Sequence, residues 1–350
     1  MNRGTVTAGV TAAIAVGLLA SACGNAAGST AGGAAGGSGN LLVSYFSNGY
    51  YSGVVATQPS LQKKIPGKVR FLQVQSGPAT LAGLKSGSYN LTTQTGNPPI
   101  LGAIAIKTDL AVVWVEAFDN AALVVQKDIK SPADLAGKKL GYLQGSSEDF
   151  SFQSWLKLNG LAGKVTLINL DRQAMTAAFK TGKIAGGFND APFTTEMVAA
   201  GGRQVVDSAQ IAGMGFPALN MVTVDRTFAK QNHDLIRGYL CADAAAHDLM
   251  TGANKNDVIT KASDFLGQDP KFGVPTGLSY PLIAPADELT PKALGTPDDV
   301  KNGAVVQSLL KTGEFLHDQG VIKTVPSIDE IAAHVDTSFA QEIAAGACSK

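Results

Sequence analysis

Two segments of the chain follow the same plan, and this repeat restricts the folds that are open to it. The segment LKSGSYNLTTQTGNPP begins at Leu84, and FKTGKIAGGFNDAP begins at Phe179. Each runs from a helix end through a Lys-[Ser/Thr]-Gly turn and a strand to an Asn-containing turn with a proline. Two copies of one unit predict two lobes built on similar strand–helix–strand units.

Short apolar runs alternate with helical stretches from Leu41 to about Gly202. The predicted strands cover residues 41–46, 68–74, 90–95, 110–118, 121–126, 139–143, 165–170, 183–188 and 219–224. The predicted helices between them cover 79–86, 98–107, 150–160 and 173–182. This alternation predicts an α/β fold with parallel sheets. After Arg226 the pattern predicts helices only, over 234–252, 256–267, 298–320 and 327–347.

Four strand-to-helix turns are rich in small and polar residues. They are QSGPAT (75–80), TGNPP (95–99), GSSEDF (145–150) and NDAP (189–192). Ligand loops of open α/β sheets lie at the carboxyl ends of the strands. We therefore expect these four turns to meet at a cleft between the lobes.

The turn GSSEDF has two interpretations. Ser146 can be the N-cap of a helix, in a capping box with Asp149. The same serines and the free N–H groups of the first helical turn can also bind an anion. The segment has neither the GxxxxGK[ST] nor the GxGxxG spacing of nucleotide loops. Both interpretations stay open from the sequence.

The N-terminal segment has the pattern of an export signal. A short apolar run, Val6 to Ala20, follows Arg3, and small residues precede Cys23. Residues 1–22 are therefore predicted to be a lipoprotein signal peptide with Cys23 as the lipidated residue. A plain secretory signal with an incidental cysteine is the alternative. Residues 23–40 are almost entirely Gly, Ala, Ser and Asn, which predicts a flexible tether at the outer face of the membrane.

Composition excludes some partners and some chemistry. The 350 residues have a formal net charge of zero, so there is no basic footprint for nucleic acid. All four histidines lie in the C-terminal helical region, and no HExxH, GxSxG or CxxC motif occurs. We predict no catalytic residues, no metal and no cofactor.

In an exported protein, Cys241 and Cys348 are expected to form a disulfide, with two unpaired thiols as the alternative.

From about Leu41 to Gly320 the chain resembles the taurine and aliphatic-sulfonate binding proteins of ABC importers, within a wider nitrate- and pyrimidine-binding group. The segments that carry the resemblance are QSGPATLAGLKSGSYNL, NAALVVQKDIKSPADLAGKKLGYLQGSS, QAMTAAFKTGKIAGGFNDAPF and DSAQIAGMGFPALNMVTVDRTFAK. The resemblance implies the type II periplasmic-binding-protein fold. Residues 41–122 and 223–350 would form the first lobe with the C-terminal helices, and 123–222 the second lobe.

The resemblance also implies a set of ligand-binding residues. Ser76 and Gly77 match a Ser-Gly that opens a helix of the first lobe, and Ser146 and Ser147 match a hydroxyl-bearing loop of the second. Asn97 occupies a turn that is Gly-Ser-Ser in the family. Tyr50 follows the first strand, where cleft walls form, with core packing as the alternative.

Departures from the family pattern concern the carboxylates. A family Glu is replaced by Ala121, with Asn120 beside it, and a family Asp is replaced by Asn220, so Asn120 and Asn220 are predicted to contact the ligand in place of these carboxylates. A family Trp is replaced by Asp190, which is expected either to keep an amine partner at a new place across the cleft or to reflect a different ligand. Asp190 as the N-cap of a helix that begins at Ala191 is the alternative. Glu148 and Asp149 add negative charge that disfavours a strongly anionic ligand.

Together these features predict a lipid-anchored, extracytoplasmic binding protein. It would hold taurine or a related small sulfonate and deliver it to an ABC permease and its ATPase, as a monomer. The alternatives are the same role for a nitrogenous heterocycle, an amine or nitrate, or an enzyme similar to those of pyrimidine synthesis. The enzyme would need His or Cys at the cleft, and the cleft turns carry neither.

Overall fold

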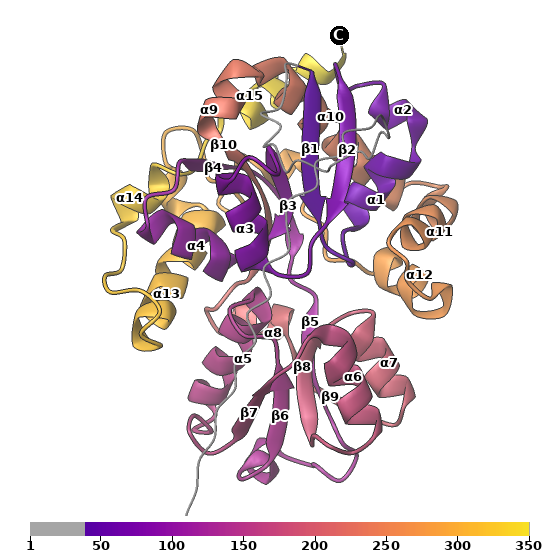
Figure 1. Ribbon diagram of the computed structural model, residues 1–350, viewed down its shortest axis with the longest axis vertical. Coiled ribbons are helices and arrows are strands. Elements are labelled where there is room, and N and C mark those ends of the chain that lie inside the picture. The colour runs from indigo at the N-terminus through magenta and orange to yellow at the C-terminus, as the bar shows by residue number, and fades with distance from the viewer. Residues whose placement is uncertain (1–38, 350) are drawn as a thin grey trace, which may run out of the picture. The chain divides into compact units, whose positions relative to one another are not determined.

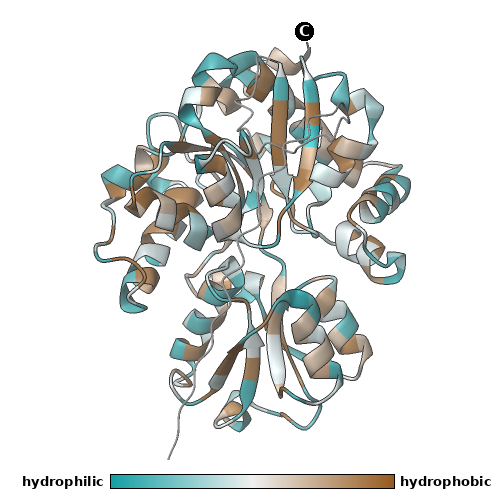
Figure 2. Cartoon of the chain, in the orientation of Figure 1, coloured by the Kyte–Doolittle hydropathy of each residue, from teal (hydrophilic) through white to brown (hydrophobic). Residues whose placement is uncertain are grey.

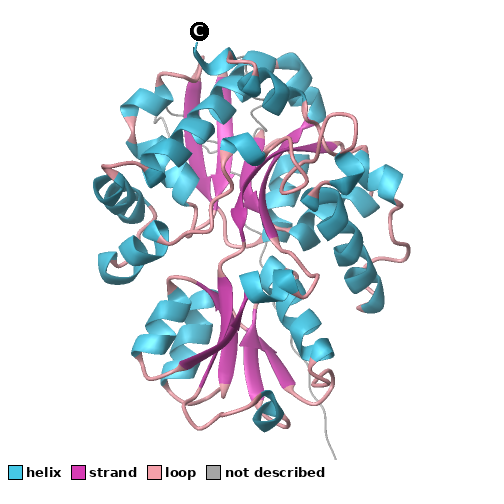
Figure 3. Ribbon diagram, turned by 180° about the vertical axis from the view of Figure 1, so that it is seen from behind, coloured by secondary structure: helices cyan, strands magenta, loops and turns pink. Residues whose placement is uncertain are grey.

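The computed structural model describes residues 39–349. The predicted signal peptide, Cys23 and all but the last residues of the predicted tether lie outside this range. Within it the chain forms two five-stranded sheets, each flanked by helices on both sides (Figures 1 and 3). We call the sheet that contains β1, with its helices, the first lobe, and the sheet that contains β6, with its helices, the second lobe.

The sheet of the first lobe has the strand order β2-β1-β3-β10-β4. Its strands are β1 (Asn40–Tyr45), β2 (Lys68–Gln73), β3 (Leu91–Thr95), β4 (Leu110–Phe118) and β10 (Leu219–Asp225). Strand β1 pairs in parallel with β2 and β3, whereas β10 is antiparallel to both β3 and β4. The fully parallel sheet predicted from the sequence is therefore wrong, because β10 enters this sheet from the second lobe and runs in the opposite direction.

The sheet of the second lobe repeats the arrangement, with the order β7-β6-β8-β5-β9. Its strands are β5 (Ala121–Val125), β6 (Lys139–Tyr142), β7 (Thr166–Asn169), β8 (Gly186–Asp190) and β9 (Arg203–Asp207). Here β5 is the strand that comes from the other lobe, and it is antiparallel to β8 and β9. Strand β9 was not predicted. It pairs with β5 alone and is partly exposed, and a short, partly polar edge strand has a weak apolar pattern.

The helices include five that the sequence pattern did not predict, at residues 50–57, 59–62, 208–213, 226–231 and 270–278, whereas the others lie close to or within predicted helical stretches. In chain order, the helices are α1 (Tyr50–Thr57), α2 (Pro59–Gln62), α3 (Gly77–Lys85), α4 (Asn97–Ala105), α5 (Ser147–Leu158), α6 (Arg172–Lys180), α7 (Phe193–Ala199), α8 (Ser208–Gly213), α9 (Arg226–Gln231), α10 (His233–Thr251), α11 (Lys255–Phe265), α12 (Pro270–Leu278), α13 (Ala304–Asp318), α14 (Ile328–Ala332) and α15 (Ser338–Ala344). Short 3₁₀ turns occur at Pro132–Leu135, Pro285–Asp287, Val300–Asn302 and Ala347–Ser349. None of the described helices is both long and apolar enough to cross a membrane.

One predicted C-terminal helix, 327–347, is two helices. The chain between α14 and α15 pairs with β4, where the Val112 N–H donates to the His334 carbonyl at 2.8 Å and the Asp336 N–H donates to the Val112 carbonyl at 3.0 Å. These bonds give β4 a partner on its open edge. The tertiary contact therefore interrupts a helix that local sequence favours.

Each lobe has its own hydrophobic core. The first-lobe core surrounds Trp114, and the second-lobe cores contain Phe152, Trp155 and Phe188, with the rings of Phe152 and Phe188 stacked at 5.3 Å. Many strand residues are hydrophobic, whereas most helices combine hydrophobic and hydrophilic residues (Figure 2). Two lobes with separate cores can move as rigid bodies about the segments that connect them.

Two short connections join the lobes. The chain leaves the first lobe between β4 and β5, at residues 119–120, and returns between α8 and β10, at residues 214–218. The two connections lie side by side, because the Asp119 N–H donates to the Ala218 carbonyl at 3.0 Å. Residues 219–222 belong to the first lobe through β10 and residues 121–122 to the second through β5, whereas the predicted boundaries placed each of these two segments in the opposite lobe.

A disulfide joins Cys241 in α10 to Cys348. This confirms the predicted pair and rules out two free thiols. The bond attaches the C-terminal segment, which also contacts α10 through an ion pair between Arg237 and Glu342 at 3.1 Å.

Loss of this disulfide is expected to lower the free energy of unfolding by about 2–4 kcal/mol, because the cross-link restricts a long loop of the unfolded chain. The measurement is urea denaturation of the wild type and of the Cys241→Ser/Cys348→Ser variant, each with and without reductant. Reductant should shift the wild type to the midpoint of the variant and leave the variant unchanged. Equal midpoints for wild type and variant under oxidising conditions would contradict the prediction.

Candidate functional site

The four predicted turns meet at one cavity of about 30 Å³, which we call the central cavity. From the first lobe it is lined by Phe46, Asn48, Ser76, Gly77, Gln94, Gly96, Pro99 and Asn220. From the second lobe it is lined by Leu143, Ser146, Ser147, Glu148, Arg172 and Asp190, and Asp119 lines it from a connection. A cavity of this size has room for about two water molecules. A larger ligand therefore requires the lobes or their side chains to move apart.

The two turns of the first lobe bring helix N-termini to the cavity. Ser76 is the N-cap of α3 and Gly96 is the N-cap of α4. Gly77 lies against the ring of Pro99, where an added Cβ would be 2.2 Å from Pro99 Cγ. Only glycine allows these two turns to pack this closely. The first lobe therefore presents backbone and small side chains at the cleft.

The two lobes are in direct contact at Gly96. A Cβ added to Gly96 would lie 1.7 Å from Ser147 Oγ and 3.1 Å from Ser147 Cβ, across the cleft at the start of α5. The backbone of Gly96 is extended, with φ −81° and ψ 175°, so any residue can adopt its conformation. The space taken by Ser147 is thus the reason for glycine here.

Ser146 is the N-cap of α5, as the capping interpretation predicted. Its hydroxyl oxygen accepts from the Asp149 N–H at 3.2 Å, and its hydroxyl donates to the Leu143 carbonyl at 2.6 Å. Asp149 accepts from the Gly145 N–H at 2.8 Å and does not return a bond to Ser146, so the predicted reciprocal capping box is incomplete. Ser146 has no free hydroxyl hydrogen in this arrangement, which leaves Ser147 as the open serine of the loop.

Asp190 is the last residue of β8 and not the cap of a helix. Helix α7 begins at Phe193 with Pro192 as its N-cap, so the capping alternative for Asp190 is wrong. Asp190 is 1% exposed, and its Oδ2 accepts from Asn48 Nδ2 at 2.8 Å across the cleft. The carboxylate therefore points to the central cavity and already bridges the lobes.

Arg172, the first residue of α6, is the one cation among the described residues that line the cavity. Its Nε donates to Asp190 Oδ2 at 2.6 Å, and its Nη2 donates to Glu148 Oε1. Burial alone would raise the pKa of Glu148, but the guanidinium outweighs burial and lowers this pKa to about 2. Glu148 is thus ionised and paired with Arg172 at neutral pH.

The other two carboxyl groups behave in the opposite way. Burial raises the pKa of Asp190 well above its usual value, against the effect of Arg172, because Glu148 is also near. Burial, together with the charge of Glu148, raises the pKa of Asp119 to about 7, although the Ser208 hydroxyl donates to it at 2.8 Å. The cleft therefore holds one guanidinium paired with Glu148 and Asp190, and the raised pKa values of Asp119 and Asp190 mean that these two groups bind a proton more readily than an exposed aspartate.

Gln94 connects the cavity to the core of the first lobe. Its φ of +51° is in the left-handed region, which non-glycine residues rarely adopt. Its N–H donates to Glu116 Oε2 at 2.9 Å, and its Nε2 donates to the Asn48 carbonyl at 3.1 Å and to the Tyr280 hydroxyl at 2.7 Å. These bonds fix the orientation of the side-chain amide and leave Gln94 Oε1 buried without a hydrogen-bond donor.

Six of the nine residues proposed for the ligand line the central cavity, and three do not. The six are Ser76, Gly77, Ser146, Ser147, Asp190 and Asn220. The Tyr50 hydroxyl donates to the Gly273 carbonyl at 2.7 Å inside the first lobe, which is the core-packing alternative. Asn97 uses both ends of its side-chain amide. Its Oδ1 accepts from the Leu219 N–H at the start of β10, and its Nδ2 donates to the Pro217 carbonyl of the returning connection. Asn120 is half-buried beside Asp119.

The sequence analysis did not predict Arg172, Asp119, Asn48 or Gln94 as residues of the cavity. Asp119 and Arg172 also follow strands, in the segments AFDNAA and INLDRQAM, so the rule applied to the other turns extends to them. Gln94 gave no such signal, because it is the fourth residue of β3 and its unusual φ is visible only in the structure.

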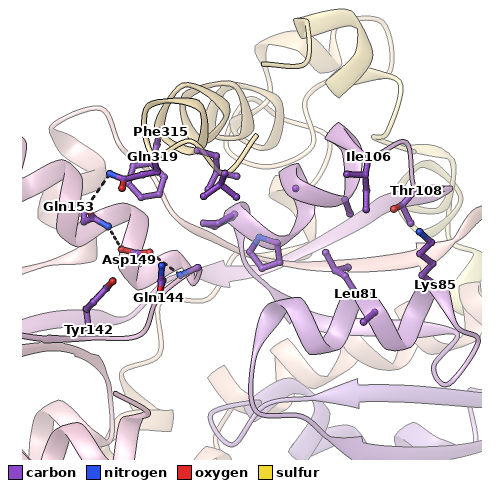
Figure 4. A pocket seen from close by; sticks show the side chains of 18 of the residues that line it. Leu81, Lys85, Ile106, Thr108, Tyr142, Gln144, Asp149, Gln153, Phe315 and Gln319 are labelled. Carbon is purple, nitrogen blue, oxygen red and sulfur yellow. Dashed lines mark hydrogen bonds between the residues drawn. The ribbon is translucent and has the colours of Figure 1, made fainter. Parts of the chain in front are cut away.

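A larger groove of about 540 Å³ lies outside the central cavity, between α3, α4 and α13 of the first lobe and the start of α5 (Figure 4). Its walls are mainly apolar, with Leu81, Ile106 and Phe315 among them. Its carboxylate, Asp149, is already bound to Gly145 N and to Gln153 Nε2. The charged and polar groups converge on the smaller central cavity, which is therefore the candidate ligand site.

Comparison with known proteins gives a family and a fold. The model described as "NMT1-like family" matches residues 45–263. The taurine-binding periplasmic protein of Escherichia coli (strain K12) is 25% identical over 306 residues, which cover 86% of this chain and 93% of that protein.

Solved structures of low sequence identity share the fold. The periplasmic aliphatic sulphonate binding protein SsuA from Escherichia coli superposes with a TM-score of 0.68 at 20% identity, over 83% of this chain and 96% of that one. The desulfurization enzyme DSZB superposes with a TM-score of 0.57 at 14% identity, over 87% and 98% of the two chains. The fold thus occurs both in a binding protein and in an enzyme. The fold alone therefore does not distinguish binding from catalysis, and the residues of the cleft have to be considered.

Proposed function

Because the chain belongs to the NMT1-like family, we propose that it is the substrate-binding protein of an ABC importer. It binds taurine or a related small sulfonate between its lobes and delivers it to the permease. The observation that carries this proposal is the central cavity. It is polar, is formed by both lobes at the carboxyl ends of their strands, and lies beside two short connections.

Each end of a taurine-like zwitterion has matching groups in the cavity. The sulfonate fits the start of α5, because Ser146, Ser147 and Glu148 line the cavity and the first turn of a helix has N–H groups without a partner in the helix. The ammonium group fits Asp190 and Asp119. Asn48 and Asn220 add amide groups from the first lobe.

Transport follows from closure of the two lobes. A ligand that contacts both lobes stabilises the closed state by its difference in affinity for the closed and open states. The permease then recognises the closed protein. Separate cores and two adjacent connections support this hinge. Identical small-angle scattering profiles with and without saturating ligand would count against it.

The location and partners belong to the same proposal. Lipidation at Cys23 would hold the protein at the outer face of the cell membrane, with residues 24–40 as a tether to the permease. We propose a monomer that acts with the permease and its ATPase, and that uses no cofactor.

The alternatives differ in ligand or in class. The same transport role for an amine, a nitrogenous heterocycle or nitrate is favoured if the Asp190 carboxylate, and not the start of α5, dominates recognition. An enzyme is disfavoured because no histidine or cysteine is found among the described residues that line the cavity. Turnover of a bound compound during prolonged incubation would support the alternative that the protein is an enzyme.

Taurine is expected to stabilise the purified protein. At a hundredfold excess over Kd it should add about 2.7 kcal/mol to the free energy of unfolding. A thermal-shift panel with taurine, alkanesulfonates, sulfate, nitrate and simple amines measures this directly. The Asp190→Asn variant should lose the response to taurine, whereas Asp128→Asn, an exposed carboxylate of the same lobe, should keep it. No shift with any sulfonate or amine would contradict the proposed ligand class.

A further inference from the structure

The charged groups of the central cavity are mostly acidic. Three carboxyl groups, Asp119, Glu148 and Asp190, line it with one guanidinium, that of Arg172. All three carboxyl groups are at most 5% exposed. If all of them were ionised, the buried site would carry a net charge of −2, which is costly at low dielectric. The site therefore needs additional positive charge or bound protons.

The polar atoms left without a partner are acceptors. Within residues 39–349, Gln94 Oε1 and Asp190 Oδ1 are buried and receive no hydrogen bond, and both residues line the cavity. Three side-chain amide donors beside these acceptors are used by the protein itself, whereas the Ser76 and Ser147 hydroxyls, on the other side of the site, donate to no described group. Asn48 Nδ2 donates to Asp190, Gln94 Nε2 to the Asn48 carbonyl, and Asn220 Nδ2 to the Tyr280 hydroxyl. Such a wall is complementary to a ligand that brings N–H donors.

The cation of the cavity is not free for an anion. Arg172 is held by Glu148 and Asp190, so a sulfonate or nitrate at its guanidinium would have to displace one of these carboxylates. That exchange would leave a buried carboxylate without its ion-pair partner, which is unfavourable at low dielectric. The start of α5 is also acidic, with Glu148 and Asp149 in its first turn.

We infer that the cleft selects its ligand through a cationic nitrogen, which takes the place of a proton held by Asp119 and Asp190, and that it rejects ligands with an anionic end alone. This inference rests on the proposed binding function and narrows its ligand class to amines and amine-bearing zwitterions. The exchange is balanced in charge, because the ligand brings one positive charge and one proton leaves to solvent.

The pH dependence follows from the groups that face the pair. They are Glu148 on α5, Arg172 on α6 and Tyr280 beyond α12, besides Asp119 and Asp190 themselves. In the free protein Asp119 has a pKa of about 7, and that of Asp190 is raised. A bound cation lowers both pKa values. Ligand binding therefore releases protons below about pH 7, and affinity rises with pH by up to about tenfold per unit for one proton.

Calorimetry on the purified protein tests the inference with four probes: taurine, 2-aminoethanol, ethanesulfonate and nitrate. Titrations at about pH 5.5 and pH 7, each in two buffers of different ionisation enthalpy, count the protons released. An alkylammonium stays protonated throughout this range. Taurine and 2-aminoethanol should bind more tightly at the higher pH and release about one proton at the lower one. Ethanesulfonate and nitrate should not bind.

Each other outcome overturns a defined part of the proposal. Ethanesulfonate that binds as tightly as taurine, or taurine that binds without release of a proton, would overturn the inference and leave the binding function standing. No binding by any of the four probes would overturn both. Asp119→Asn supplies a check in a variant that keeps the Arg172 ion pairs. It should lower the number of protons released, whereas Asp128→Asn should not.

Discussion

Replacement of Arg172 by alanine is expected to lower the free energy of unfolding by about 3–5 kcal/mol at neutral pH and to abolish ligand binding. Arg172 is the partner of two carboxylates that are almost fully buried, Glu148 and Asp190. Removal of one partner of a buried ion pair leaves an uncompensated charge, which is far more costly than the pair is favourable. Urea denaturation at pH 7 measures the effect on stability.

The loss should diminish in acid. In the wild type the lowered pKa of Glu148 means that its ion pair stabilises the fold above the usual pKa of a glutamate. This stabilisation is lost as the pH falls toward about 2. Without Arg172, Glu148 is protonated at a higher pH, so the variant and the wild type should converge as the pH is lowered.

Lys180→Ala is the matched control for Arg172→Ala. Lys180 is at the other end of the same helix and pairs with Glu196 at 2.7 Å, but its side chain is 44% exposed. An exposed pair contributes less than about 1 kcal/mol, so this variant should remain close to the wild type. Equal stability of the two variants at pH 7 would show that the ion pairs of Arg172 with Glu148 and Asp190 contribute no more than an exposed pair does.

Gly96→Val is expected to weaken ligand binding at least about a hundredfold with little change in the stability of either lobe. The new Cβ would overlap Ser147 Oγ at 1.7 Å, and rotation of that hydroxyl still leaves Ser147 Cβ at 3.1 Å. The two methyl groups of valine then prevent full closure of the lobes. If the closed state falls below about 1% of the population, the apparent Kd rises by the inverse of that fraction.

The matched control is Gly102→Ala on the same helix. A Cβ at Gly102 has no atom within 4 Å, and alanine is preferred to glycine inside a helix. This variant should bind as the wild type does and be equally or slightly more stable. Small-angle scattering with saturating ligand should show a more open Gly96→Val protein. Wild-type affinity in Gly96→Val would mean that Ser147 and Gly96 do not meet in the bound state.

The turns that surround the site could be predicted from the sequence because their signals are local. Small and polar residues after a strand and before a helix place Ser76, Gly96, Ser146 and Asp190 at the carboxyl ends of strands. In a mainly parallel arrangement these ends share one edge of the sheet. The two repeated segments, which begin at Leu84 and Phe179, then predicted two such edges, and the structure brings both edges to the central cavity.

The use of each residue at that cavity could not be predicted in the same way. Asn97 and Tyr50 have the same polar groups as ligand-binding residues, yet both satisfy them within the first lobe. The antiparallel direction of β5 and β10 was not predicted either. The apolar pattern of a strand is the same whether its neighbours are parallel or antiparallel to it.

The sequence by itself determined the two-lobe α/β plan, the positions of nine of the ten strands and of most of the longer helices, and the turns that form the cleft. These follow from periodicity, capping and turn chemistry, which act over a few residues. Only the tertiary structure decided that Arg172 pairs with Glu148 and Asp190, that Asp119 joins them, and that Gly96 touches Ser147. Charge and contact depend on distances across the packed lobes, and those distances arise only when both sheets and their connections are in place.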